Sequence, residues 1–348
     1  MKIASFFSGA GGLDLGFTNA GFELIFANDN WKGCWETFEK NHNLPINKKS
    51  ITEISPDEIP NVAGFIGGPP CQSWSLAGAM KGINDPRGKL FYDYANLIRE
   101  KKPLFFLAEN VAGILSPKHY GEFLKIIEAF KKRGYNVSYK LLDAKYYNVP
   151  QERKRVIVVG YHKNLGKKFE FPPVNLRLIS LKEAIGNLPA PISAREKNKT
   201  NKELSMPNNE YMNGGFSTIY MSRNRVRSWD EQSFTIQAGG RHAPIHPQAP
   251  KMKFIRQNKR EFEKGKEHLY RRLSVRECAR IQTFPDDFIF YYNDVSDGYK
   301  MIGNAVPVKF AEALAKKIMK DMLDFQKENI LSWQAEPKIG KEAKLLTG

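Results

Sequence analysis

The cysteine at position 71 is the residue whose surroundings best suit a chemical role. It follows Pro69 and Pro70, which come directly after a short apolar run, residues 64–67, that is expected to form a buried strand. A thiol held rigidly at the carboxyl edge of a sheet, where open α/β sheets bind ligands, is a candidate nucleophile. A lone cysteine is more often a buried structural residue. The polar residues that follow Cys71 count against burial and favour the nucleophile.

A carboxyl group and two guanidinium groups are expected near the same edge. Glu109 directly follows the most apolar run of the chain, residues 104–108. A carboxyl group in such apolar surroundings can deliver a proton. Residues 151–155 read Gln-Glu-Arg-Lys-Arg, and alternate residues of a strand share one face, so Arg153 and Arg155 are both expected to point into the crevice. Taken singly, a strand-end Glu and a charged run are usually solvated. Their combination with Cys71 favours a catalytic interpretation.

A glycine-rich turn, residues 7–12, separates the first expected strand from the first expected helix. Glycines allow a tight turn and a close approach to a ligand, and the helix N-terminus adds the positive end of a dipole. The pattern is neither the usual dinucleotide fingerprint nor a phosphate loop. It fits a cofactor that carries a nucleoside, with Asp29, at the end of the second expected strand, placed to bind ribose hydroxyls.

These groups require an alternation of strands and helices to bring them together. In the first 160 residues, short apolar runs alternate with segments of helical periodicity, which predicts an α/β fold with a doubly wound, Rossmann-like parallel sheet. Ser274 and Glu277 form a capping-box pattern at the start of a later helix, and Pro307 begins the last clear one. We predict one domain from residues 1–173 and 273–326, a smaller irregular domain from 174–272, and a polar tail at 327–348.

Charge and composition narrow the class of partner. The 348 residues carry a net charge of +17, and residues 163–272 hold 22 Lys and Arg against 10 Asp and Glu, which suits a polyanion such as nucleic acid. No apolar run could span a membrane, and the N-terminus lacks a signal-peptide pattern. Cys34 and Cys278 are interpreted as structural, and three cysteines at unrelated spacings predict a reducing cytoplasm. The six histidines show no metal-binding spacing, so we expect no metal site.

Together these segments resemble the cytosine-C5 DNA methyltransferase family, in the family's order and from residue 5 to about 320. The matching motifs are Phe7 to Gly12, Pro69-Pro70-Cys71-Gln72, Glu109-Asn110-Val111, Gln151-x-Arg153-x-Arg155, Arg276 to Gln282 with Phe284-Pro285, and Gly303-Asn304-Ala305-Val306-Pro307. The resemblance implies S-adenosylmethionine as methyl donor. It also implies that the last helices pack beside the first strand and complete the cofactor pocket, and that residues 174–272 form a target-recognition, DNA-binding domain.

The resemblance also implies a mechanism. The Cys71 thiolate attacks C6 of cytosine and turns C5 into a nucleophile, while Glu109 protonates or hydrogen-bonds N3. Arg155 holds O2, and Arg153 supports the loop. Because none of this can happen inside a stacked duplex, the cytosine must be flipped out of double-stranded DNA. The loop from Gln72 to Gly88 is expected to close over it.

Further contacts are implied for the cofactor and for DNA. The cofactor residues are Phe7, Gly9, Ala10, Gly11, Gly12, Asp29, Asn30, Ser50, Ile51, Pro70, Leu90, Asn304 and Ala305. The DNA-binding residues are Ser73, Ser75, Arg87, Arg223, Arg225, Arg227 and Arg241. At Ser50 the family usually has an acid that faces the adenine amino group, and at Asp29 a longer Glu is common. We therefore expect weaker cofactor binding than is typical of the family.

The recognition region suggests a target. Arginine reads guanine through O6 and N7, and residues 222–227 place arginines at alternate positions, although arginine also binds phosphates. Within the family this region resembles an enzyme that modifies the inner cytosine of GGCC, and one apolar residue of 219–221 is expected to fill the gap left by the flipped base. We expect a monomer in the bacterial cytoplasm, associated with the nucleoid through DNA and not with a membrane, with a cognate restriction endonuclease encoded nearby.

Three alternatives remain. A DNA-binding module that has lost catalysis would need neither Cys71 nor Glu109. A tRNA cytosine methyltransferase on the same fold would not need so large a recognition region. A Rossmann oxidoreductase would show a different glycine pattern and would leave both residues without a role.

Overall fold

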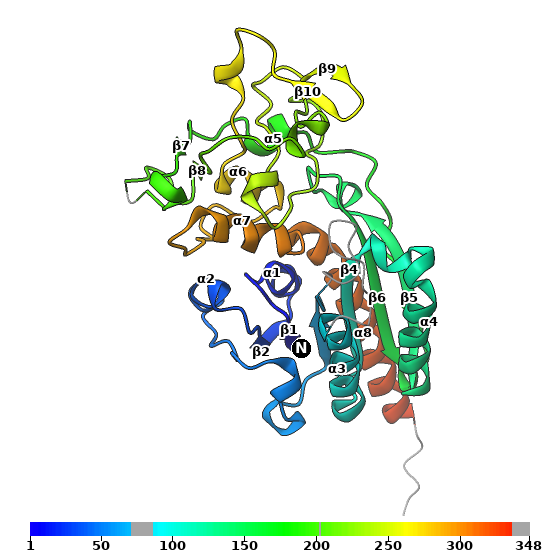
Figure 1. The fold of residues 1–348 in the computed structure, drawn as a ribbon. Coiled ribbons are helices and arrows are strands. Elements are labelled where there is room, and N and C mark those ends of the chain that lie inside the picture. Colours follow the sequence, from blue (N-terminus) through cyan, green and yellow to red (C-terminus); the bar gives the residue numbers. More distant parts are fainter. Residues whose placement is uncertain (71–85, 202, 336–348) are drawn as a thin grey trace, which may run out of the picture.

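The computed structural model describes residues 1–70, 86–201 and 203–335, and the side chains of all of these except 86–89 and 328–335. A six-stranded sheet forms its centre, in the order β2-β1-β3-β4-β6-β5 (Figure 1). The strands are β1 (Lys2–Phe6), β2 (Glu23–Asn28), β3 (Gly64–Gly67), β4 (Phe105–Val111), β5 (Tyr135–Asp143) and β6 (Lys154–His162). The predicted α/β class is therefore confirmed.

The sheet is mixed, which corrects the expectation of an all-parallel arrangement. Strands β1 to β4 pair in parallel, but β6 is antiparallel to both β4 and β5. The connection from β5 to β6, residues 144–153, holds only the 3-10 turn Ala144–Tyr147. Such a connection is too short for the helical crossover that a parallel neighbour needs, so the chain turns back on itself.

Helices cover both faces of the sheet. On one face α1 (Gly12–Asn19) and α8 (Val308–Ala335) pack on the strands through Leu13, Phe17 and Phe310. On the other face lie α3 (Pro86–Lys101) and α4 (Pro117–Lys132), with Phe123 and Phe130 in a second core (Figure 1). The last helix thus packs beside the first elements of the chain, as expected, and it begins directly after Pro307.

Regular structure is sparse between residues 174 and 272. The elements there are α5 (Leu181–Ile185), β7 (Ile192–Ser193), β8 (Glu210–Tyr211), β9 (Lys253–Arg256) and β10 (Lys259–Glu261), at the upper end of the molecule in Figure 1. One small core around Tyr220, Val226 and Ile245 belongs to this region alone. A further core joins Leu181 and Ile236 of the region to helices α6 (Val275–Ile281) and α7 (Val295–Asn304). The recognition region is therefore anchored on the rest of the molecule through shared apolar packing.

Two further helices lie near the sheet, α2 (Lys32–His42) and α7 (Val295–Asn304). Helix α6 (Val275–Ile281) begins with the predicted capping box, in which Ser274 and Glu277 each bind the backbone of the other. Within the described ranges, no helix is both long and apolar enough to cross a membrane.

Candidate active site

A cavity of about 390 Å³ lies at the carboxyl ends of the first strands of the sheet. Its walls come from residues 5–9 after β1, 29–31 after β2, 68–70 after β3, Glu109 at the end of β4, and 304–306 after α7. Open α/β sheets bind ligands at this edge, and the volume lies within the range of pockets for small molecules.

Most of the predicted cofactor residues line this cavity. Those that do are Phe7, Gly9, Asp29, Asn30, Pro70, Leu90, Asn304 and Ala305. Ala10, Gly11, Gly12, Ser50 and Ile51 are not among its lining residues. Ile51 is buried in the core beneath α3, and Ser50 caps a 3-10 turn by exchanging hydrogen bonds with Glu53. The expected effect of Ser50 on cofactor affinity stays a prediction.

The glycines of the first turn serve close packing. Gly11 has a φ of 87°, in the left-handed region, and it forms the N-cap of α1. A Cβ on Gly12 would lie 2.4 Å from the carbonyl oxygen of Val306. Gly12 therefore allows the start of α1 to approach the loop after α7, whereas the missing side chain of Gly11 leaves room for the His42 ring.

Two aspartate carboxyl groups line the cavity, that of Asp29 and that of Asp14. Asp29 accepts hydrogen bonds from the backbone N–H groups of Gly9 and Trp31, both at 2.8 Å, and burial raises its pKa. Asp14, in the first turn of α1, is fully buried, and neither of its oxygens has a hydrogen-bond partner among the described residues. Burial raises the pKa of Asp14 to about 7, which the nearby hydroxyls of Ser5 and Ser8 offset only in part.

Glu109 and Arg155 form an ion pair at the edge of the cavity. The Arg155 Nε atom lies 2.6 Å from Glu109 Oε1, and only about a tenth of each side chain is exposed. The pair spans β4 and β6, whose antiparallel register places Val111 opposite Arg155. Asn110 donates a hydrogen bond to the carbonyl oxygen of Pro69 at 3.4 Å. The end of β4 thus holds the turn that directly precedes Cys71 in the sequence.

The Arg153 side chain does not point into the crevice beside Arg155, contrary to the expectation for both residues. Its side chain is buried and donates hydrogen bonds to the carbonyl oxygens of Ile236, Gly303 and Ala305 at 2.9–3.1 Å. Arg153 precedes the first residue of β6, so strand alternation does not apply to it. It ties the sheet, the recognition region and the loop after α7 together.

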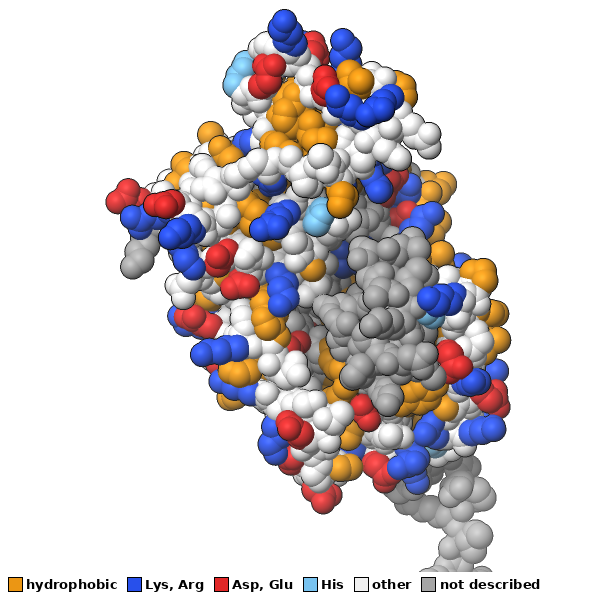
Figure 2. All heavy atoms as spheres, viewed as in Figure 1, with side chains coloured by type: hydrophobic (Ala, Val, Ile, Leu, Met, Phe, Trp, Pro, Cys, Tyr) orange, Lys and Arg blue, Asp and Glu red, His pale blue; other side chains and the backbone are white. Residues whose placement is uncertain are grey.

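The predicted DNA-binding residues fall into three groups. Ser73 and Ser75 lie outside the described residues, as do the side chain of Arg87 and the predicted nucleophile, Cys71. Arg223 and Arg241 are exposed on the recognition region, whose outer end carries many Lys and Arg side chains (Figure 2).

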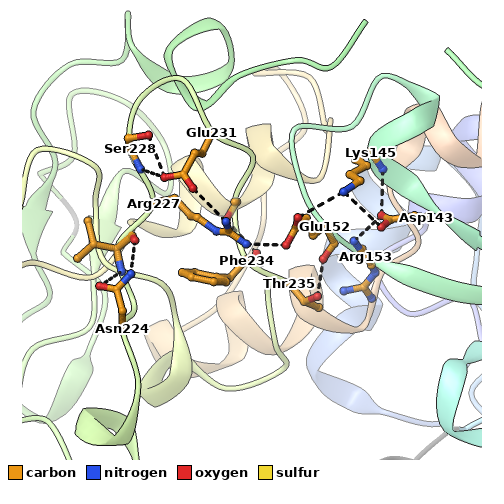
Figure 3. Close-up of polar contacts among 12 residues, drawn as sticks. Asp143, Lys145, Glu152, Arg153, Asn224, Arg227, Ser228, Glu231, Phe234 and Thr235 are labelled. Carbon is orange, nitrogen blue, oxygen red and sulfur yellow. Dashed lines mark hydrogen bonds and ion pairs between the residues drawn. The ribbon is translucent and has the colours of Figure 1, made fainter. Parts of the chain in front are cut away.

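The other two predicted DNA-binding arginines have protein partners. Arg225 donates to the carbonyl oxygen of Tyr220 and lies over its ring, 4.7 Å from the centroid. Arg227 pairs with Glu152 and Glu231, so a DNA contact by Arg227 would require these ion pairs to break (Figure 3).

Several residues that line the cavity were not predicted from the sequence. Asp14, Trp31 and Lys300 all line it, and the Lys300 Nζ atom lies 3.9 Å from the centre of the Trp31 ring system. Asp14 could have been noticed, since it stands in the first turn of the helix that follows the glycine-rich turn. Trp31 and Lys300 come together from distant parts of the chain and carry no local signal. Cys34 and Cys278 are buried, as their structural interpretation predicted.

Comparison with known proteins decides what kind of enzyme this is. A family model described as C-5 cytosine-specific DNA methylase matches residues 1–320. The chain belongs to that family. It is 66% identical over 323 residues to the Type II methyltransferase M.MthTI of Methanothermobacter thermautotrophicus, covering 92% of this chain and 98% of that one. It is 53% identical over 332 residues to the Type II methyltransferase M.FnuDI of Fusobacterium nucleatum, covering 94% and 96%.

Solved structures agree on the fold. A DNA modification methyltransferase encoded within an E. coli prophage superposes with a TM-score of 0.71 at 23% identity, covering 93% of this chain and 99% of that one. The family model and the Type II relatives, and not this likeness in fold, show that the protein is a DNA cytosine-5 methyltransferase, with DNA as its substrate. Of the three alternatives, the family excludes the oxidoreductase, and the high identity to Type II methyltransferases favours a DNA methyltransferase over the tRNA enzyme and the silent module.

Proposed function

We propose that this DNA cytosine-5 methyltransferase transfers a methyl group from S-adenosylmethionine to the inner cytosine of GGCC in double-stranded DNA. The observation that carries the proposal is the cavity at the sheet edge, whose lining contains the carboxyl groups of Asp14, Asp29 and Glu109, the last of which is paired with Arg155. Cys71 follows the cavity residue Pro70 directly in the sequence.

The chemistry of the cavity fits this donor. S-adenosylmethionine carries a sulfonium and an ammonium cation. The carboxyl group of Asp29, and that of Asp14 once it is ionised, would supply matching negative charge. Asp29 is fixed by two backbone N–H groups, and each of its oxygens has a further lone pair that can accept from a ribose hydroxyl. When bound, the donor supplies an electrophilic methyl group. Phe7 and Leu90 offer apolar surface for the adenine ring.

The roles of the protein groups follow from their positions. We assign Cys71 as the nucleophile that adds to C6 of the flipped cytosine, and Glu109 as the group that protonates or hydrogen-bonds N3. Arg155, held against Glu109, is placed to bind O2 of the same base. Arg153 supports this arrangement through its three carbonyl contacts. A flipped base at this cavity is required because C6 is inaccessible within a stacked duplex.

The recognition region supports the target sequence. Residues 220–227, 246–250 and 265–272 resemble the HaeIII modification methyltransferase, which modifies the inner cytosine of GGCC. Arg223 and Arg241 are exposed and suited to reading guanine. Of residues 219–221, Ile219 is 71% exposed whereas Tyr220 is buried, so Ile219 is the candidate to fill the gap left by the flipped base.

The biological setting completes the proposal. Because its relatives are Type II methyltransferases, we propose that the enzyme protects host DNA in a restriction-modification system. A cognate endonuclease that cuts GGCC would be encoded nearby. We propose that the enzyme acts as a monomer in the cytoplasm of a bacterial cell.

A duplex with 5-fluorocytosine at the inner position of GGCC tests both the nucleophile and the target. Fluorine at C5 cannot leave as a proton, so wild-type enzyme with S-adenosylmethionine should form a covalent adduct that survives denaturing electrophoresis. Cys71→Ala should form none, and neither should wild type on a duplex with a scrambled site. If wild type forms no adduct at GGCC, the proposal fails. An adduct at the scrambled site as well would reject the target but keep the mechanism.

A further inference from the structure

The contact between Glu152 and Arg227 joins the recognition region to the catalytic sheet (Figure 3). Glu152 precedes β6, in the segment that leads to Arg155. Arg227 ends the segment, residues 222–227, that also carries Arg223, one of the two arginines proposed to read DNA. The two residues are 75 positions apart in sequence, so their contact depends on how the two parts of the molecule fit together.

The geometry of the pair is well defined. Arg227 Nη2 donates to Glu152 Oε2 at 2.6 Å, and Arg227 Nη1 donates to Glu231 Oε1 at 3.1 Å. The guanidinium lies over the ring of Phe234, 4.2 Å from its centroid. Only 24% of the Arg227 side chain is exposed. Two carboxylates and one aromatic face thus fix the position of this guanidinium, as expected for a group with a positioning role.

Glu152 is held both by Lys145, on the catalytic side, and by further residues of the recognition region. Its other oxygen accepts from Lys145 Nζ at 3.3 Å, and its carbonyl oxygen accepts from Thr235 Oγ1 at 2.6 Å. Its backbone N–H donates to the carbonyl oxygen of Ser233 at 3.0 Å. Residues 227–235 therefore lie along the segment before β6 through side-chain and backbone contacts together.

This segment leads directly to the proposed catalytic pair. Arg153, the next residue, is fixed by Asp143 through its backbone N–H and by carbonyl contacts through its side chain. Arg155 comes two residues later and pairs with Glu109. A displacement of Glu152 relative to Arg227 would change the distance between the DNA-reading surface and the groups that receive the base.

We infer that Glu152 and Arg227 are positioning residues that set the register between DNA recognition and the active site. They contact neither the base nor the donor. They hold the recognition segment so that a cytosine flipped from bound DNA meets Glu109 and Arg155 in the productive orientation. Errors of about 1 Å in such placement can lower a rate roughly 100-fold while binding persists. The inference rests on the proposed roles of Glu109 and Arg155.

Variants of the pair test this inference. We would compare Glu152→Gln, Arg227→Gln, the double variant and the charge swap E152R/R227E, using unmethylated phage DNA, which offers every short target site. Each single variant should lower kcat at least about tenfold and change KM for DNA less than about twofold. The double variant should be no worse than either single variant, because both break one contact. The charge swap should recover part of the loss.

Arg177→Gln is the matched control. It breaks an ion pair of equal length, Arg177 Nη2 to Glu183 Oε1 at 2.6 Å, but both partners belong to the recognition region and are more exposed. It should leave kcat and KM unchanged. Arg227→Lys, which keeps the charge but not the forked geometry, gives an intermediate loss of kcat and serves if Arg227→Gln does not fold.

Two results would overturn the inference. If Arg227→Gln weakens DNA binding and its salt dependence while Glu152→Gln has no effect, Arg227 is a phosphate contact. If the two losses of kcat multiply in the double variant, the residues act independently. The two claims are tested by different experiments. If wild type forms no adduct at Cys71 with the 5-fluorocytosine duplex, the proposed catalytic roles are rejected. The coupling between Glu152 and Arg227 is tested by the kcat values of the single and double variants.

Discussion

The carboxyl groups of Asp14 and Asp29 line the same cavity but differ in their hydrogen-bond partners. Asp29 accepts two backbone hydrogen bonds, whereas Asp14 is buried without a hydrogen-bond partner within the described parts of the chain. Burial raises the pKa of Asp14 from 3.8 to about 7. Asp14 therefore releases its proton in the unfolded chain near pH 4 but in the folded protein only near pH 7.

This difference predicts how Asp14→Asn affects stability. Between pH 4 and 7 the folded protein holds a proton that the unfolded chain releases, so wild-type stability falls as pH rises through this window. At pH 8 the cost reaches at most ~4 kcal/mol, from about three pKa units. Asn is neutral at both pH values, so Asp14→Asn should stabilise at pH 8 and change little at pH 4. Urea denaturation at the two pH values measures this, and an equal effect at both would contradict it.

The sequence predicted some site residues and not others for a physical reason. Glu109 and Asp29 follow apolar strands, and a strand end at the carboxyl edge is a position that local pattern defines. Arg153 and Arg227 were expected to face ligands, yet their side chains bind carbonyl or carboxylate groups distant in sequence. Whether a long cationic side chain meets a ligand or another part of the chain depends on tertiary packing, which no local pattern encodes.

The contact between α1 and α8 sets the position of the cavity wall at the scale of elements. A Cβ on Gly16 of α1 would lie 2.4 Å from the Cβ of Ala311 and 2.7 Å from the backbone N of Glu312. Both helices are buried on this side, and neither can move away without opening the core beside the sheet. Gly16 is therefore required for the close approach of the two helices.

Gly16→Ala should be destabilising although alanine is the better helix former. Helix propensity alone favours Ala by about 1 kcal/mol, but overlap with the backbone of α8 should cost more, for a net loss of roughly 1–3 kcal/mol. Gly121→Ala is the control, because Gly121 in α4 is exposed and its added Cβ would meet no described atom within 4 Å. It should gain about 0.5–1 kcal/mol. If both variants shift the unfolding midpoint in the same direction, close packing does not determine how Gly16→Ala changes stability.

The elements themselves were predictable where their apolar pattern was continuous. Strands β1, β3, β4 and β6 correspond to apolar runs in the sequence, because both faces of a central strand are covered. Strand β5 was missed, since it is an edge strand with exposed residues at its centre. The direction of β6 was not predictable from its own residues, because the short connection from β5 decides it.

Buried histidines link the stability of the whole molecule to pH. Burial lowers the pKa of His42, which packs against the glycine-rich turn, to about 4. It lowers that of His246, in the recognition region, to about 4 as well. Glu277 lies 3.4 Å from His246, but Arg271 already pairs with Glu277, so the carboxylate does not reverse the effect of burial. Both histidines are therefore neutral in the folded protein near pH 6, where an exposed histidine is largely charged.

The histidines change the free energy of unfolding with pH in the direction opposite to Asp14. As pH falls from 6.5 to 4, the unfolded chain binds protons that the folded protein excludes, so each histidine lowers stability by up to ~3 kcal/mol. Asp14 offsets part of this loss of stability, because its contribution to the free energy of unfolding rises as pH falls from 7 to 4. Between pH 7 and 5, the free energy of unfolding should therefore fall more steeply in Asp14→Asn than in wild type, and less steeply in His246→Gln. Urea titrations across this range would measure the three slopes, and slopes that coincide would show that these buried groups do not control the acid sensitivity of the enzyme.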